Sequence, residues 1–123
     1  METISCTWKQ FEKGAVLLAE QIKQKNWDTT FIFGIPRGGL VLAVRLSHLL
    51  DIPLLIKDPL SNEVIGNVLI VDDISDSGKT LLSYKEKKYR IVTLYCKKGS
   101  VTVPDLWIYQ KKEKWILFPW EKK

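Results

Sequence analysis

The sequence predicts one α/β domain built on an open parallel β-sheet with helices on its faces. Short apolar runs typical of strands alternate with helical segments, and this alternation favours a parallel sheet with right-handed crossover connections. Residues 68–71 (VLIV) are apolar without interruption, as expected for a strand covered on both faces. A length of 123 residues is enough for one core and leaves no room for a second domain.

An amphipathic helix is predicted directly after Thr7. Thr7 and Gln10 have the spacing of a capping box, in which each side chain satisfies a free N–H group at the start of a helix. Apolar residues then follow at intervals of three and four, which places them on one helix face. They are Trp8, Phe11, Ala15, Leu18 and Ile22.

The remaining elements are predicted from short apolar runs and from the glycines between them. Strands are expected at residues 31–35, 53–56, 68–71, 91–96 and 106–109. Residues 40–50 are apolar on most sides and predict a buried helix, and a short helix is expected to begin near residues 78–80. The domain is expected to span residues 1–123, with a small hood formed mainly by residues 110–123 and the N-terminal segment.

Composition argues against a secreted, membrane-spanning, disulfide-bonded or zinc-binding protein. The N-terminus lacks the basic and apolar regions of a secretion signal, and no apolar run approaches the ~20 residues that span a bilayer. Two distant cysteines, Cys6 and Cys96, and one histidine argue against a disulfide framework and against structural zinc. A cytoplasmic protein without a membrane partner is therefore expected.

Lysine runs account for much of the net charge of +5. They lie at residues 85–88, 97–98, 111–114 and 122–123, and each by itself is interpreted as a solvated face or tail. Together they favour an anionic ligand, although charge alone does not separate a nucleic acid from a small phosphorylated substrate. A nucleic-acid-binding protein that uses these lysines with Trp107 and Trp115 is the weaker alternative, since no RNA- or DNA-binding motif accompanies them.

The most informative segment is residues 67–80 (NVLIVDDISDSGKT), where an apolar strand is followed by three acids and a small-residue loop. Ligands of open α/β sheets bind beyond the carboxyl ends of the strands. A glycine-containing loop that leads into a helix offers free N–H groups to a phosphate. The acids Asp72 and Asp73 would repel that phosphate, so they are expected to face sugar hydroxyls or a metal ion. A Walker A loop is excluded, because that motif needs a glycine five positions before Gly78 and the residue at that position is Asp73.

Residues 68–80 resemble the phosphoribosyl-pyrophosphate (PRPP) signature of the type I phosphoribosyltransferases. By this resemblance, Asp72 and Asp73 hold the two ribose hydroxyls, with Mg²⁺ nearby through the ribose or water, and the following loop holds the 5′-phosphate. Asp76 is the candidate general base toward purine N7. The residues that the resemblance assigns to the ribose and phosphate of PRPP are Asp72, Asp73, Asp76, Ser77, Gly78, Lys79 and Thr80.

Two further segments resemble the bacterial and archaeal xanthine-guanine enzymes of this family. Residues 34–40 (GIPRGGL) are similar to their pyrophosphate loop, which implies that Pro36, Arg37 and Gly38 bind pyrophosphate and that the peptide before Arg37 is cis. Arg37 is also a catalytic candidate, because its planar, permanently charged fork suits a leaving pyrophosphate.

Residues 115–121 (WILFPWE) resemble the C-terminal motif of the same enzymes. The resemblance implies that Trp115 stacks on a purine, that Ile116 contacts it through its backbone and that Lys97 donates to the purine 6-oxygen. Glu121 is a candidate for placing Mg²⁺ or pyrophosphate. Coverage of a sheet edge by the aromatic residues is the alternative.

The resemblance therefore implies a Mg²⁺-dependent transferase of purine salvage that acts on PRPP and a 6-oxopurine. It also implies a dimer or tetramer of identical chains and no nucleic-acid partner. A non-catalytic PRPP- or nucleotide-binding regulator on the same fold is the alternative. The chain departs from the family at residues 57–67, which are shorter than the loop that usually closes over the substrates, so this segment is not expected to seal the site alone.

Overall fold

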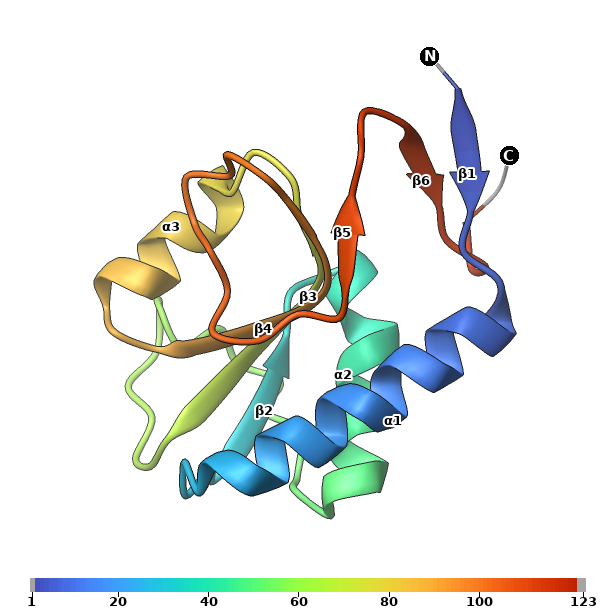
Figure 1. Cartoon of the computed structure of the whole chain (residues 1–123). Helices are drawn as coiled ribbons and strands as arrows, with labels where there is room; N and C mark the ends of the chain where they lie inside the picture. Colours follow the sequence, from blue (N-terminus) through green and yellow to red (C-terminus); the bar gives the residue numbers. More distant parts are fainter. Residues whose placement is uncertain (1, 122–123) are drawn as a thin grey trace.

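The computed structural model describes residues 2–121 and confirms the α/β class. Four parallel strands form the main sheet in the order β2-β3-β4-β5, and β1 pairs with β6 in a parallel two-stranded sheet (Figure 1). The elements are β1 (Thr3–Ser5), α1 (Trp8–Lys25), β2 (Phe31–Gly34), α2 (Gly38–Leu50), β3 (Val68–Ser75), α3 (Lys79–Glu86), β4 (Arg90–Lys97), β5 (Tyr109–Lys111) and β6 (Trp115–Leu117). In the part of the chain described here, no helix is long and apolar enough to cross a membrane.

Both faces of the main sheet are buried. Alternate side chains of β3 point to opposite faces, so that Leu69 and Val71 pack with α1 and α2, while Val68 and Ile70 pack with α3. Figure 1 shows α1 and α2 side by side, with α3 across the sheet from them. The uninterrupted apolar run at residues 68–71 therefore has the cause that the sequence predicted.

Helix α1 begins as predicted. The Thr7 side chain accepts a 3.1 Å hydrogen bond from the Gln10 backbone, and the Gln10 side chain accepts one of 2.9 Å from the Thr7 N–H. Phe11 and Leu18 lie in the core. Trp8 begins the helix and packs edge-on against Phe11 and at a tilt against Trp120, but it is 56% exposed.

Three of the predicted strands differ from their predicted bounds by more than one residue at an end. The segment at residues 53–56 makes a single bridge, between Leu54 and Ile32, through the backbone hydrogen bonds that Ile32 makes with Pro53 and Leu55. The last strand of the main sheet is β5, which begins at Tyr109, whereas Leu106 makes only an isolated bridge to Val92. Strand β3 continues through Asp72 and Asp73 to Ser75, because its pairing with β4 continues there. Strands β1 and β6 were not predicted, and each has only three residues.

The parallel arrangement determines where chemistry can occur. All four strands of the main sheet end at one edge, so their carboxyl ends bring together residues that are distant in the sequence. Helices α2 and α3 begin at the same edge, directly after β2 and β3. The predicted phosphate and pyrophosphate loops are therefore neighbours in space.

Candidate active site

Three neighbouring cavities meet at Asp73, near the carboxyl ends of the strands. The first, of about 960 Å³, lies at the start of α2 and is also lined by Arg37, Gly38 and Glu121. The second, of about 230 Å³, is lined by residues 72–78 together with Thr80 and Leu81. The third, of about 110 Å³, lies between Asp76 and β6. Because Asp73 lines all three, a ligand with three parts could occupy them together.

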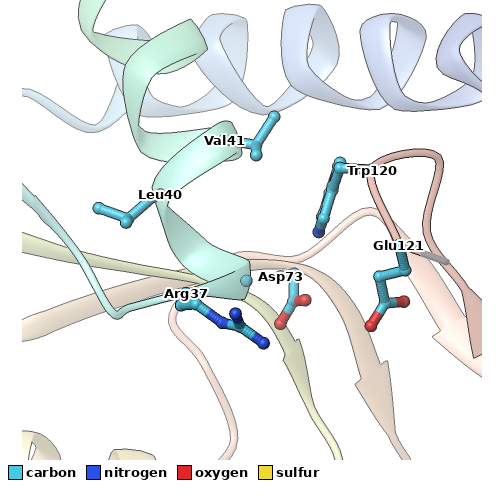
Figure 2. A pocket seen from close by; sticks show the side chains of 7 residues that line it. Arg37, Leu40, Val41, Asp73, Trp120 and Glu121 are labelled. Carbon is cyan, nitrogen blue, oxygen red and sulfur yellow. The ribbon is translucent and has the colours of Figure 1, made fainter.

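The first cavity holds the predicted pyrophosphate loop. The peptide bond between Pro36 and Arg37 is cis, as the resemblance implied. Figure 2 shows the charged ends of Arg37, Asp73 and Glu121 pointing into the same open space, next to Trp120. A permanently charged donor thus lies beside carboxylates, which is a suitable arrangement for a phosphate group with a bound cation.

The start of α2 lies directly on strand β3. A Cβ atom on Gly39 would lie 2.5 Å from the carbonyl oxygen of Val71, and one on Gly38 would overlap the carboxylate of Asp73. Larger side chains at these two positions would therefore push the loop away from the acids. The close approach explains why the sequence has two glycines here.

Asp72 and Asp73 form a partly buried acidic pair. Burial, followed by the charge of Asp73, raises the pKa of Asp72 to about 8. Burial is also the main reason why the pKa of Asp73 is raised, and the charge of Glu121 adds to it. Two carboxyl groups in this state favour a cation or hydroxyl donors over an anion.

The residues present fit a Mg²⁺ ion that is shared with a substrate. Among residues 2–121, no group of three or more His, Cys, Asp or Glu side chains could hold a metal ion by itself. Mg²⁺ commonly binds through one or two carboxylates together with substrate phosphates and water. Burial raises the pKa of both Asp72 and Asp73, and a hard cation bound beside the pair would favour their charged forms.

The second cavity is formed by the predicted phosphate loop and the start of α3. Gly78 has a φ of 84°, a conformation that glycine adopts readily, and its carbonyl accepts a 2.7 Å hydrogen bond from the hydroxyl of Thr102. The Ser77 carbonyl accepts a 2.9 Å bond from Val101. Ser77, Lys79 and Thr80 are exposed at the opening of the loop, and the Lys79 N–H donates to the Ser77 hydroxyl.

The sequence did not predict the support of this loop by residues 100–102. Buried Ser75 bonds the Ser100 hydroxyl at 2.8 Å and the Thr102 carbonyl at 2.7 Å. The lone signal in the sequence was the cluster of small hydroxyl residues after Gly99, which is also typical of any turn.

The third cavity contains the predicted base-binding residues Trp115 and Ile116 together with Asp76. Trp115 is 54% exposed and Ile116 is buried, so the indole is available while the neighbouring backbone is fixed by pairing with β1. Lys97 is not one of the lining residues, but its Nζ lies 4.0 Å from Oδ1 of Asp76.

The same cavity is lined by Lys111, which the sequence did not predict as a site residue. The interpretation of residues 111–114 as a solvated cluster was wrong for this residue: Lys111 is 8% exposed, and its Nζ donates a 3.2 Å hydrogen bond to Oδ2 of Asp76. Pairing of β5 with β4 places it beside Lys97 and therefore in the sheet. The lysines at 122–123 lie outside the described residues.

Known proteins support a purine-related function for this arrangement. No family model matches the chain. The chain is 31% identical to the xanthine-guanine phosphoribosyltransferase of Cereibacter sphaeroides, over 94% of this chain and 84% of that protein. The solved purine phosphoribosyltransferase from Pyrococcus horikoshii is 37% identical, with a TM-score of 0.85 over 100% of this chain and 97% of that one. A Helicobacter pylori xanthine-guanine-hypoxanthine phosphoribosyltransferase, at 23% identity, shares the fold with a TM-score of 0.77 over 98% of this chain and 94% of that one.

Proposed function

The chain belongs to the xanthine-guanine phosphoribosyltransferase family, and we propose that it transfers the 5-phosphoribosyl group of PRPP to a 6-oxopurine. Guanine, xanthine and hypoxanthine are the candidate bases, and the products are a nucleoside 5′-monophosphate and pyrophosphate. The observation that carries this proposal is the junction of three cavities at Asp73. PRPP and a purine together present three parts, namely pyrophosphate, phosphoribose and base.

The phosphoribosyl end is assigned to the second cavity. Asp72 and Asp73 bind the ribose hydroxyls, because a carboxylate accepts hydrogen bonds from vicinal hydroxyl groups. The 5′-phosphate binds the N–H groups of the loop and of the first turn of α3, where the helix dipole favours an anion. The loop consists of Asp76, Ser77, Gly78, Lys79 and Thr80.

The pyrophosphate end is assigned to the first cavity. Breaking the bond between C1′ and the pyrophosphate oxygen builds positive charge on the ribose and negative charge on the leaving group. Arg37 stabilises that negative charge, and Pro36 and Gly38 contribute the backbone of the loop. Mg²⁺ held near Asp72 and Asp73 through ribose hydroxyls or water, with Glu121 adjacent, would neutralise further charge on the pyrophosphate.

The base is assigned to the third cavity. Trp115 stacks on the purine, the backbone of Ile116 contacts its edge and Lys97 donates to the 6-oxygen. Asp76 accepts the proton from purine N7 as the new bond to C1′ forms. Asp76 lines both the second and the third cavity, so it lies between the ribose and the base.

The test is incubation with Mg²⁺, PRPP and a panel of purines, followed by separation of nucleotide products. Nucleotide formed from guanine, xanthine or hypoxanthine, and much less from adenine, is the expected result. Binding of PRPP by calorimetry without any nucleotide product would support the alternative, a non-catalytic regulator. A dimer or tetramer and a cytoplasmic location remain predictions from the sequence; sedimentation and cell fractionation test them.

A further inference from the structure

Lys111, which is buried in β5, forms an ion pair with Asp76, which directly follows β3 on the other side of β4. Lys111 has no part in the roles assigned above. Lysine is rarely this well buried unless its charge is paired. Within residues 2–121, Asp76 is the one carboxylate within 4 Å of the Lys111 ammonium group. Asp76 itself is partly open, with 41% of its side chain exposed. The pair therefore joins a buried ammonium group in β5 to a partly exposed carboxylate, and both residues line the third cavity.

The register of the sheet brings the three charged groups together. Lys97 in β4 pairs with Lys111 in β5, and paired residues of a parallel sheet point to the same face. Asp76 directly follows Ser75, which is paired with the residue before Lys97. The three residues therefore form a row across the carboxyl ends of three adjacent strands.

The two lysines differ in how they hold the carboxylate. Lys111 donates to Oδ2 at 3.2 Å, which is hydrogen-bond distance. Lys97 lies 4.0 Å from Oδ1, beyond that distance, and the same ammonium group is also 4.0 Å from the exposed Glu113. Across the described residues, the Lys111 ammonium group is the sole donor that makes a hydrogen bond to the Asp76 side chain.

We propose that Lys111 is a positioning residue that fixes the Asp76 carboxylate through Oδ2 and leaves Oδ1 directed at the purine. This inference rests on the proposed function, in which Asp76 is the general base. A carboxylate held in one rotamer needs no reorganisation when the base arrives, and small misplacement of a reacting group is costly in rate. Lys97, which is not committed to a hydrogen bond with Asp76, stays available for the 6-oxygen.

The test is a double-mutant cycle on the transferase reaction with guanine. Lys111→Met keeps the length and apolar part of the side chain and removes the ammonium group. We expect it to lower kcat by about 10²-fold and to change KM for PRPP by less than about threefold, because the PRPP contacts remain. Lys112→Met is the matched control, since Lys112 is exposed and directly follows β5, and it should leave kcat and KM unchanged.

The cycle separates positioning from an independent contact with the base. If Lys111 acts through Asp76, Lys111→Met should lower kcat less than about threefold further in an Asp76→Asn background, because there is no base left to position. The proposal would be overturned if Lys111→Met lowered kcat by less than about tenfold. It would also be overturned if adding Lys111→Met to Asp76→Asn lowered kcat by more than about a further threefold.

Two controls make either result conclusive. Thermal melting verifies that each variant is folded at the assay temperature, and Lys111→Gln replaces Lys111→Met, with the same thresholds, if that variant is not. If the parent protein forms no nucleotide from any purine, the proposed function itself fails. A working parent with an unaffected Lys111→Met variant removes only the role of Lys111.

Discussion

The backbone N–H of Asp73 donates a 2.9 Å hydrogen bond to Oδ1 of Asp72, and the two acids remain crowded in the C-terminal half of β3. The bond fixes the relative position of two carboxyl groups without supplying a positive charge. Burial, together with the neighbouring charge, raises the pKa of Asp72 to about 8. The site is thus arranged for ligands at a cost in stability.

This cost predicts a pH-dependent stability. A carboxyl group whose pKa is raised by folding binds its proton more tightly in the folded than in the unfolded chain. Its contribution to stability is therefore complete below about pH 4 and is lost as the pH rises toward about 8. Asp72→Asn should raise Tm by at least ~4 °C at pH 8 without Mg²⁺, and the gain should shrink toward pH 4.

Melting curves of the parent and the variant between pH 4 and 8 test this prediction. Glu20→Gln, on the exposed face of α1, is a matched removal of one carboxylate away from the site and should not reproduce the effect. A lower Tm for Asp72→Asn at pH 8 would show that the pair stabilises the fold.

The same acids should be essential for PRPP. The double variant Asp72→Asn, Asp73→Asn keeps the shape of both side chains but removes the charges that attract hydroxyl donors and Mg²⁺. We expect PRPP affinity, measured by calorimetry with Mg²⁺, to fall by at least ~10-fold, equivalent to ~1.4 kcal/mol. Unchanged PRPP affinity in a folded double variant would show that Asp72 and Asp73 do not bind the ribose.

Gly78 and Gly99 provide a matched test of the phosphate loop. Both have positive φ, 84° and 89°, but a Cβ on Gly78 would lie 2.5 Å from the Thr102 N–H nitrogen, while one on Gly99 meets nothing within 4 Å. Gly99→Ala should cost only the backbone strain, about 1–2 kcal/mol. Gly78→Ala should cost more in urea unfolding and also weaken PRPP binding. Equal effects of the two changes on both measurements would contradict the contact with residues 100–102.

The sequence predicted the parts of this site that are local. Residues 68–80 contain a strand, a loop and a helix start in one continuous segment, so the order of residue types there was sufficient to predict all three. The support of Gly78 by Thr102 and the burial of Lys111 depend on pairing between distant segments. A lysine in a run of charged residues gives no sign of burial until the register of the short strand β5 is known.

The base site predicts a difference between purines. Lys97→Ala should raise KM for guanine and hypoxanthine by about tenfold, roughly the worth of a charge-assisted hydrogen bond, and affect adenine much less. Trp115→Ala should weaken all bases similarly, because stacking depends little on the ring substituents. Lys98→Ala, at the exposed neighbouring position, is the control for charge. Equal effects of Lys97→Ala on adenine and guanine would remove the main support for a 6-oxopurine.

The segment at residues 57–67 packs on the α3 face of the sheet. The hydroxyl of Tyr84 donates a 3.1 Å hydrogen bond to Oδ1 of Asp58, and that of Tyr89 reaches the carbonyl of Pro59 at 3.5 Å. Leu60 and Val64 pack against the core on that face. A segment anchored at its start and by its apolar residues would have to give up these contacts in order to cover the substrates.

We therefore predict that residues 57–67 do not act as a lid, and that water reaches C1′ of bound PRPP. Without a purine, PRPP should be hydrolysed to ribose 5-phosphate and pyrophosphate at a rate above the protein-free control, because a closed lid is what normally excludes water. Turnover with guanine should respond little to solvent viscosity, since lid opening does not limit it. Tyr84→Phe, which removes only the bond to Asp58, should leave kcat within about twofold because the segment has no part in closure. Complete protection of PRPP together with strong viscosity dependence would indicate that another part of the assembly, such as a neighbouring subunit, closes the site.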